Sequence, residues 1–247
     1  MKSFNFKDQV AFITGTNKKN GIGRAIANAL LNAGAKKIYA TARDVSQLDD
    51  FVKEHDGKVV AVPLDVTDLE AIKKLPTLYK DVTMVVNNAG YFSPTQNEVE
   101  GALKEIQVNY IAPMAIVNSF APILKEHTTN TAVVNVASIA ALVNFPIGGL
   151  YSASKAAAHS LTQAQRRELS TSLVIGVYPG PIDTAMAEGL PFDKTPPNAV
   201  GDAVIKALKE GQEDVFPDAM AQNLHEGWKQ DAKALEQQMA KPVEVAH

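Results

Sequence analysis

Short apolar runs alternate with longer amphipathic segments along most of the chain. The apolar runs are rich in valine and isoleucine, and most are apolar at successive positions. This pattern is typical of strands in a parallel sheet that is covered on both faces. The runs predict strands at 10–14, 37–41, 59–63, 83–87, 132–137 and 173–178, and a last short strand at 213–216.

The amphipathic segments predict the helices that carry the chain from the end of one parallel strand to the start of the next. They lie at 22–33, 45–55, 68–74, 98–126, 151–171 and 198–210. The alternation predicts an α/β fold, a doubly wound parallel sheet with helices on both faces. No Gly/Ser-rich linker or repeat divides the chain, so residues 1–247 are expected to form one domain. Pro113 is expected to bend the unusually long helix at 98–126.

A further helix is predicted at 218–240, after the last strand. One helical stripe of this segment carries its apolar side chains: Met220, Leu224, Trp228, Ala232, Leu235 and Met239. Two interpretations are open. The stripe covers the protein's own core, or it forms a subunit contact or a cover over the active site.

Composition narrows the class of protein. Hydrophobic residues make up 46% and charged residues 21%, which is ordinary for a globular chain. The net charge of −3 gives no electrostatic reason to expect nucleic acid or an anionic membrane as a partner. The uncharged stretch 128–154 is broken by Asn, Pro and Gly, and the N-terminus lacks a secretory signal, so a soluble protein is expected.

The sequence contains no cysteine, which excludes disulfides and thiolate chemistry and suits a reducing, cytoplasmic location. The five histidines show no metal-ligand spacing, so no metal site is expected.

A glycine-rich turn follows the first predicted strand. The strand ends at Thr14-Gly15 and continues through TNKKN into the GIG of residues 21–23, where a helix begins. Such a turn lets backbone N–H groups approach a pyrophosphate, and the helix N-terminus adds partial positive charge. Three later strands end in ATARD (40–44), LDVTD (64–68) and NNAG (87–90), at the sheet edge where open α/β sheets bind ligands.

Tyr151 and Lys155 are four residues apart in a predicted helix, so their side chains share one face. A nearby ammonium favours the phenolate, and the spacing therefore predicts a tyrosine whose pKa falls towards neutrality. Such a pair also occurs by chance on surfaces. Its context favours chemistry, because Ser138 closes an apolar run thirteen residues earlier and Asn109 lies in the preceding long helix.

Taken in order, these motifs resemble the short-chain dehydrogenase/reductase family over nearly the whole chain. The resemblance rests on TG…GIG at 14–23, DV at 65–66, NNAG at 87–90, Asn109, Ser138, YSASK at 151–155 and PGPIDT at 179–184. It implies a Rossmann fold and an enzyme that interconverts a ketone or aldehyde and an alcohol by hydride transfer.

The resemblance also implies roles for the catalytic residues. Tyr151 is the general acid/base, and Ser138 positions the substrate oxygen. Lys155 lowers the Tyr151 pKa and binds the nicotinamide ribose, and Asn109 holds a water that connects Lys155 to solvent.

For the cofactor, the resemblance implies contacts along the whole edge. The expected cofactor-binding residues are Gly15, Asn17, Lys18, Gly21, Ile22, Gly23, Arg43, Asp65, Val66, Asn88, Ala89, Gly90, Tyr151, Lys155, Pro179, Gly180, Ile182 and Thr184. One departure from the family pattern is the five-residue gap between Gly15 and Gly21, where three residues are usual. Contacts within this longer loop are open: Lys18 or Lys19 binds phosphate or is merely solvated, and Asn17 binds or braces the loop.

NADP(H) is the predicted cofactor. At the end of the second strand, Ala42 occupies the place of the carboxylate that an NAD site uses, and Arg43 follows it. A guanidinium grips a 2′-phosphate, which a carboxylate would repel. Asp44 is expected to cap the next helix.

The substrate is expected to be a small, apolar carbonyl compound or alcohol. Apolar side chains near the site are Phe92, Ile139, Leu142, Phe145, Met186, Leu190 and Phe192, the last three in a loop at 185–197. Two alternatives are a 3-oxoacyl reductase, for which Arg166 and Arg167 offer charge to an acidic carrier, and a non-catalytic NADP(H)-sensing protein.

The family resemblance implies a homodimer or homotetramer built through the long helix and the catalytic helix. Small side chains that allow close packing there are Ala112, Ala115, Ala156, Ala157 and Ala158.

Overall fold

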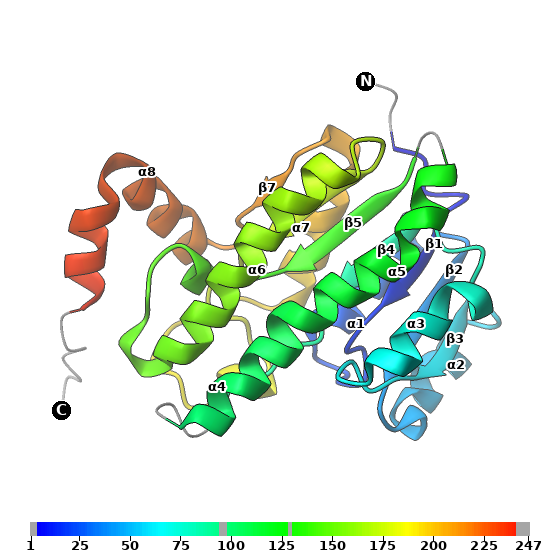
Figure 1. Cartoon of the computed structure of the whole chain (residues 1–247), viewed down its shortest axis with the longest axis horizontal. Coiled ribbons are helices and arrows are strands. Elements are labelled where there is room, and N and C mark those ends of the chain that lie inside the picture. Colours follow the sequence, from blue (N-terminus) through cyan, green and yellow to red (C-terminus); the bar gives the residue numbers. More distant parts are fainter. Residues whose placement is uncertain (1–3, 94–97, 128–129, 241–247) are drawn as a thin grey trace.

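The computed structural model describes residues 4–93, 98–127 and 130–240. Within these residues a seven-stranded parallel sheet has the order β3-β2-β1-β4-β5-β6-β7 (Figure 1). The strands are β1 Val10–Ile13, β2 Lys37–Ala42, β3 Val59–Pro63, β4 Met84–Asn87, β5 Ala132–Val136, β6 Leu173–Val177 and β7 Asp214–Val215. All six pairings are parallel, which confirms the predicted single doubly wound α/β domain.

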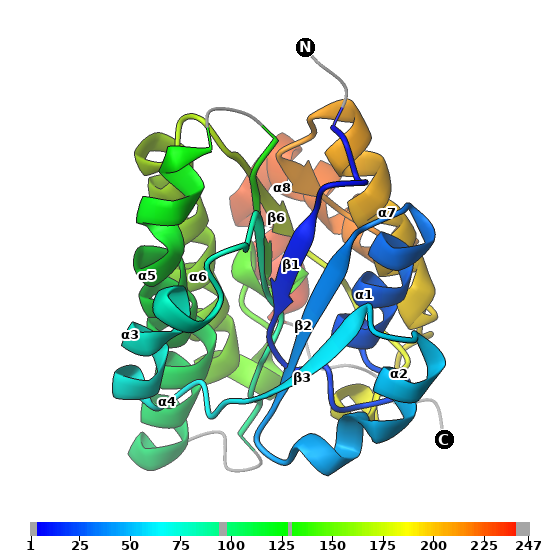
Figure 2. The same cartoon turned by 90° about the vertical axis from the view of Figure 1, so that its right-hand side faces the viewer.

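Helices cover both faces of the sheet, as Figure 2 shows nearly edge-on. One face carries α3 Leu69–Leu78, α4 Val99–Ile106, α5 Ala112–Glu126 and α6 Gly149–Glu168. The other carries α1 Ile22–Asn32, α2 Asp49–Glu54 and α7 Pro197–Glu210. Short 3₁₀ turns are η1 Val45–Leu48, η3 Ile139–Ala141, η4 Pro146–Gly148 and η5 Ala185–Ala187. Within the described parts of the chain, no helix combines the length and apolarity needed to cross a membrane.

The core has two layers because successive side chains of each strand point to opposite faces. In β1, Phe12 enters a cluster with Phe120 of α5, whereas Ile13 enters the opposite cluster with Ile26 of α1. All four side chains are fully buried. A strand that is covered on both faces needs apolar residues at every position, which explains the continuous apolar runs of the sequence.

The long helix predicted at 98–126 is continuous across α4, the π-helical turn η2 (Gln107–Ile111) and α5. The wide turn is marked by the Ala112 N–H, which bonds to the Gln107 carbonyl five residues earlier. Pro113 follows at the start of α5 and has no N–H to give to the Asn109 carbonyl. The expected irregularity is therefore present, and its form is a π turn around Asn109.

The helix α8, Ala219–Met239, lies outside the two helical layers and contacts η3 (Figure 1). It is broken at Asp231, whose backbone (φ −157°, ψ 94°) is not helical. The Asp231 carboxylate accepts hydrogen bonds from the Lys233 and Ala234 N–H groups and so starts a second helical segment. Leu235 is buried where this segment folds back against Gly227.

The helix predicted at 218–240 is confirmed, but the break at Asp231 divides its apolar stripe. The interpretation of the stripe as a subunit contact or a cover over the active site stays a prediction. Trp228 is 37% exposed and Ala232 is exposed, so the stripe does not cover the core as a unit. The helix predicted at 68–74 is also longer than expected, because α3 continues to Leu78 despite Pro76.

Phe120 tests the layer that positions α5. Its ring centroid lies 5.2 Å from that of Phe12, and the side chain is fully buried. Phe120→Ala leaves a cavity under α5 and is expected to lower the free energy of unfolding by about 3–5 kcal/mol. Urea denaturation followed by circular dichroism measures this loss. Leu78→Ala, at a position 66% exposed, is the matched control and should change stability by less than about 0.5 kcal/mol.

Candidate active site

The predicted site residues lie at the carboxyl edge of the sheet, in the loops that follow β1 to β6 and in the helices that come after them. The chain order reverses between β1 and β4, which are paired neighbours in the middle of the sheet. Helices on either side of this point lie on opposite faces of the sheet, so the loops diverge and leave room for a ligand.

Hydrogen bonds between Thr14 and the segment after β4 join the two loops at this reversal. The Asn88 side chain donates to the carbonyls of Thr14 and Gly15, both at 2.9 Å. In return, the Thr14 hydroxyl accepts from the backbone N–H groups of Asn88 (2.9 Å) and Ala89 (3.0 Å). The Asn88 side chain therefore braces the glycine-rich turn, and the predicted contact of Asn88 with the cofactor stays a prediction.

The glycine-rich turn passes very close to this segment. Gly15 has φ +70°, and a Cβ on it would lie 2.8 Å from the Cα of Ala89, so only glycine fits. Gly21 is the N-cap of α1 and has no side chain to occupy the N–H groups of the first turn, where Ile22 and Gly23 lie. These donors and the helix dipole face the same edge.

Arg24 holds the extended part of this turn, a role that the sequence analysis missed. Its buried guanidinium donates to the Thr16 carbonyl (3.2 Å) and the Gln47 carbonyl (3.4 Å), and pairs with Asp50 (3.3 Å). Asn17 adds a hydrogen bond from its side chain to that of Gln47 at 2.8 Å. These bonds fasten the turn to η1. The Asn17 bond to Gln47 supports the interpretation that Asn17 braces the loop. Lys18 is exposed.

Arg43 follows β2 and is exposed at the same edge. Asp44 caps η1 by accepting from the backbone N–H of Ser46 at 3.0 Å, as predicted. Asp65, after β3, accepts from the Thr67 N–H and hydroxyl, and these bonds hold its pKa below the ordinary value, with a smaller contribution from the Arg43 charge. The Arg43 charge is therefore close enough to Asp65 to influence its pKa.

The structure brings Ser138, Tyr151 and Lys155 together. Tyr151 and Lys155 begin α6, and the Lys155 Nζ lies 5.5 Å from the Tyr151 ring centroid. The same Nζ donates to the Val136 carbonyl at the end of β5 at 3.0 Å, and Ser138 follows two residues later. Phe92, after β4, packs edge-on against the Tyr151 ring with centroids 5.2 Å apart, and forms one wall of this group.

Asn109 is buried in the π turn and joins the post-β4 loop to α6. Its side chain accepts from the Tyr91 N–H (2.9 Å) and donates to the Tyr91 carbonyl (2.8 Å) and the Ser154 hydroxyl (2.9 Å). Ser154 is the residue before Lys155. All four predicted catalytic residues are therefore part of one cluster, with Asn109 at its rear.

Burial dominates the electrostatics of the pair. It raises the pKa of Tyr151 well above its ordinary value, against a lowering contribution from the Ser138 hydroxyl. Burial also lowers the pKa of Lys155 to about 8. The expectation that Lys155 brings the tyrosine pKa towards neutrality is not met, because desolvation of the buried phenol outweighs the contributions that favour the phenolate.

Glu105 is a second residue that the sequence analysis missed. It is fully buried one turn before Asn109, and its Oε1 accepts from the Ser93 N–H at 2.7 Å. Burial raises its pKa, and its charge contributes to the raised pKa of Tyr151. With Asn109 it fixes the backbone on both sides of Phe92. An acidic residue on a helix face that is otherwise apolar is the signal that would have identified it.

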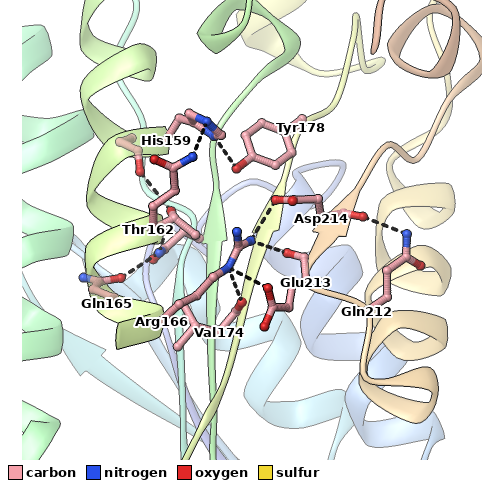
Figure 3. A network of polar contacts seen from close by, with 12 residues as sticks. His159, Thr162, Gln165, Arg166, Val174, Tyr178, Gln212, Glu213 and Asp214 are labelled. Carbon is pink, nitrogen blue, oxygen red and sulfur yellow. Dashed lines mark hydrogen bonds and ion pairs between the residues drawn. The ribbon is translucent and has the colours of Figure 1, made fainter. Parts of the chain in front are cut away.

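Arg166 lies at the far end of α6, away from the site. Figure 3 shows its guanidinium bonded to the Val174 carbonyl (3.2 Å), the Glu213 carbonyl (2.6 Å) and the Asp214 carboxylate (2.7 Å). Since Val174 is near the start of β6, this network belongs to the amino edge of the sheet. Arg166 therefore offers no basic patch at the site mouth.

His159, on the same helix, bonds to the residue that follows β6. Its Nδ1 lies 2.7 Å from the Tyr178 hydroxyl, and burial lowers its pKa (Figure 3).

The PGPIDT segment after β6 packs directly against the catalytic group. The Pro179 carbonyl accepts from the Ile139 N–H at 3.0 Å and from the Ser138 hydroxyl at 3.4 Å. Ile182 pairs with Thr195 in a parallel bridge, so the two ends of the loop between them lie side by side. Met186 in this loop is 47% exposed.

Comparisons with known proteins agree with this arrangement. The family model described as short chain dehydrogenase matches residues 9–194. An oxidoreductase of Staphylococcus saprophyticus is 30% identical over 220 residues, which are 83% of this chain and 92% of the relative. A short chain dehydrogenase of Burkholderia cenocepacia, solved in complex with NADP, is 36% identical with a TM-score of 0.87, covering 96% of this chain and 100% of that one.

A short chain dehydrogenase/reductase of Burkholderia phymatum, solved in complex with NAD, has a TM-score of 0.82 over 98% of this chain and 100% of that one. It is 21% identical, so the likeness is one of fold. The family match begins before the glycine-rich turn and ends at residue 194, within the loop after β6, and so includes all the predicted site residues. This chain therefore belongs to the short-chain dehydrogenase/reductase family, a family of oxidoreductases.

Proposed function

We propose that this protein is an NADP(H)-dependent enzyme that interconverts a ketone or aldehyde and the corresponding alcohol. The observation that carries the proposal is the grouping of Ser138, Tyr151 and Lys155 beside the glycine-rich turn, at one edge of the sheet. A proton donor, a hydroxyl that holds an oxygen and a buried cation are the side chains that carbonyl reduction requires.

The residues present fit a dinucleotide. Gly15 and Gly21 carry no side chains, so the backbone of the turn can approach a pyrophosphate closely, and the positive φ of Gly15 with its contact to Ala89 requires glycine there. The uncapped first turn of α1 supplies N–H donors and a positive helix end. Gly15, Gly21, Ile22 and Gly23 would hold the pyrophosphate. The adenosine would contact Asp65, Val66, Asn88, Ala89 and Gly90, and the nicotinamide would contact Pro179, Gly180, Ile182 and Thr184.

When bound, the nicotinamide supplies or accepts the hydride. Tyr151 donates a proton to the substrate oxygen as negative charge develops on it. Ser138 holds the same oxygen with its hydroxyl, and Asn109 keeps the post-β4 loop and α6 in register. The raised pKa of Tyr151 keeps the phenol protonated at neutral pH, which supports its role as the acid in the reductive direction.

Lys155 supplies the positive charge of the site. With its pKa lowered to about 8, it is cationic at neutral pH and near its titration point. A cation close to the Tyr151 ring stabilises a phenolate as the proton leaves. Its bond to the Val136 carbonyl fixes the ammonium at the end of β5.

Support for NADP(H) comes from Arg43, which is exposed after β2 beside a position without a carboxylate. The nearest acid, Asp44, is occupied as the cap of η1. The Burkholderia cenocepacia relative was solved with NADP. Lys18 is exposed on the extended turn and is a second candidate contact for a 2′-phosphate.

An apolar carbonyl substrate is favoured by the walls of the site. Phe92 packs on Tyr151, Ile139 is buried next to Ser138, and Met186 is exposed in the loop after β6. For the alternative, a 3-oxoacyl reductase with an acidic carrier, Arg166 offers no support because it lies at the amino edge. The NADP(H)-sensing alternative is disfavoured because both Tyr151 and Lys155 are present.

A homodimer or homotetramer in the cytoplasm completes the proposal. Val99 and Leu103 of α4 are 75% and 65% exposed, which supports a subunit contact on this face. Ala112 and Ala158 are buried within the chain itself, so they do not supply the small residues of such a contact.

Tyr151→Phe tests the reaction. Removing the hydroxyl leaves no proton donor at the substrate oxygen, so kcat is expected to fall at least about 1,000-fold, while NADPH binding survives. A panel of ketones, aldehydes and acyl thioesters, scored by loss of NADPH absorbance, measures the activity and identifies the substrate class. Tyr79→Phe, in a remote aromatic cluster with Phe12, is the matched control. Turnover in Tyr151→Phe close to that of the wild type would refute the assignment.

Arg43 tests the choice of cofactor. The wild type should show a lower KM for NADPH than for NADH, and Arg43→Asp should raise the KM for NADPH at least about tenfold, because a carboxylate repels the 2′-phosphate. The KM for NADH should change little, since NADH carries no phosphate there. A wild-type preference for NADH would contradict the proposal. Lys53→Asp, a charge reversal on α2, controls for net charge.

Lys155 predicts how stability depends on pH. Its pKa is about 8 in the folded chain, below the ordinary 10.5. Between these values the unfolded chain holds a proton that the folded chain has released, so stability rises with pH, by at most about 1.4 kcal/mol per pH unit. Urea denaturation from about pH 8 to pH 10 should show this rise in the wild type. Lys155→Met should lack it, and equal slopes in the two proteins would contradict the buried titration.

A further inference from the structure

We propose that Asp218 is a positioning residue for the cofactor and the substrate: it holds the loop 179–184 in place through the backbone N–H of Gly180. The proposal rests on the function proposed above, because that loop is assigned there to the nicotinamide. The residue lies on neither the glycine-rich turn nor the catalytic helix, and precedes α8.

Both oxygens of the Asp218 carboxylate are used, and the residue is 5% exposed. Oδ2 accepts from the Gly180 N–H at 2.8 Å. Oδ1 accepts from the Ala221 N–H at 2.9 Å and so caps α8. Hydrogen bonds from N–H groups to a buried carboxylate are strong, and the positive end of the helix dipole adds to them. One side chain therefore joins the start of α8 to the loop after β6.

The sequence at 180 is adapted to this contact. A Cβ on Gly180 would lie 2.6 Å from the Asp218 Oδ1, closer than carbon and oxygen atoms can approach. The φ of Gly180 is not in the left-handed region, so glycine is needed here for the space that Asp218 takes and not for its backbone freedom. The glycine and the aspartate form a fitted pair.

On the opposite side, the same loop touches the catalytic group. The residue before Gly180 is Pro179, whose carbonyl accepts from the Ser138 hydroxyl and the Ile139 N–H. Gly180 thus lies between Ser138 and Asp218 in one continuous set of hydrogen bonds. A shift of the loop towards α8 would move an acceptor of the Ser138 hydroxyl and change how that hydroxyl meets the substrate oxygen.

Stacked rings hold α8 against the end of β6 and keep Asp218 in place. Tyr178 stacks on Phe216 (5.2 Å between centroids), and Phe216 stacks on His225 of α8 (3.8 Å). His225 is followed by Trp228, with centroids 6.4 Å apart, and Trp228 is the single tryptophan of the sequence. Its emission therefore reports the docking of α8 separately from events in the loop.

The test compares Asp218→Ala and the milder Asp218→Asn with Asp231→Asn. Asp231 is the matched control, because it caps the second segment of α8 in the same way but has no bond to the loop. Three quantities are measured for each protein: hydrogen exchange at Gly180, the dissociation constant for NADPH, and the emission of Trp228. The Asp183 N–H, which bonds to the Thr195 carbonyl, is an internal reference for exchange.

We expect exchange at Gly180 to be at least about tenfold faster in Asp218→Ala, since a buried N–H loses its acceptor. Exchange should also be faster in Asp218→Asn, because its single neutral amide oxygen replaces the two charged oxygens that accept from Gly180 and Ala221. The dissociation constant for NADPH should rise about tenfold. The fold decrease in kcat should be larger than the fold change in KM for the carbonyl substrate. Asp231→Asn should match the wild type in both exchange at Gly180 and NADPH binding. Asp218→Asn keeps the fold if the alanine variant fails to accumulate, because it preserves size and one acceptor oxygen.

Two results would overturn the proposal. One is exchange at Gly180 and NADPH binding within twofold of the wild type in Asp218→Asn. The other is a shifted Trp228 emission with an unchanged Gly180, which would make Asp218 a helix cap alone. If the wild type itself binds no NADPH, the proposed function fails, whereas the exchange at Gly180 still decides whether Asp218 holds the loop.

The fitted pair gives a reciprocal test. Gly180→Ala should lower the melting temperature by several degrees in the wild-type background, because its Cβ meets the Asp218 carboxylate. In the Asp218→Ala background the same substitution should be much less damaging, since the obstacle is gone. Additive losses in the double variant would show that the two positions are not coupled and would count against the proposal.

Discussion

The hydrogen bonds between Thr14 and Asn88 join β1 to the segment after β4 at the point where the chain order of the sheet reverses. In a parallel sheet the last residue of each strand loses its ladder partners, and the two loops at a reversal point move apart. A threonine hydroxyl and an asparagine amide replace the lost partners here. Because the Asn88 side chain also donates to the Gly15 carbonyl, the glycine-rich turn is fixed to the loop that continues to Tyr91 and Phe92. Both halves of the site depend on this connection.

From that point the site extends outward by a series of buried side chains that each serve two elements. Arg24 joins the turn to η1, Asn109 joins the post-β4 loop to α6, and Lys155 joins α6 to β5. Each carries a polar group that burial would make costly unless it were hydrogen-bonded. The requirement to satisfy these groups holds the loops in one arrangement, which is the preorganisation that a hydride-transfer site needs.

The sheet and the catalytic cluster were predictable from the sequence because local patterns indicate both. Strands of a sheet that is covered on both faces are continuous apolar runs, and the four-residue spacing of Tyr151 and Lys155 indicates one face of a helix. Asp231 was not predictable in this way, since the apolar stripe of 218–240 continues across the break and only the three-dimensional packing of Leu235 on Gly227 selects the kinked form. The π turn at Asn109 was anticipated only as a bend, because Pro113 removes a hydrogen bond without dictating which turn replaces it.

The electrostatic prediction failed for a related reason. Helical spacing gives the separation of Tyr151 and Lys155 but not their desolvation, and desolvation is a property of everything packed around them. Phe92, the π turn and the buried Glu105 all lie on the side of the site that is distant in sequence from α6. Desolvation and the Glu105 charge oppose the phenolate more than the Ser138 hydroxyl favours it, so a neutral phenol is the resting form. The proton is held until charge develops on a bound oxygen.

The position of α8 follows from the same logic. A surface helix outside the two main layers has little apolar area with which to influence a buried site, as the exposure of Trp228 and Ala232 indicates. Its influence depends instead on the Asp218 carboxylate before its first turn. The bonds of this buried carboxylate to the Gly180 and Ala221 N–H groups restrict both the loop and the start of α8. This constraint reaches Ser138 through Gly180, which bonds to Asp218 and follows Pro179, the acceptor of the Ser138 hydroxyl. The loop therefore cannot move relative to the helix cap without also moving the acceptor of the Ser138 hydroxyl.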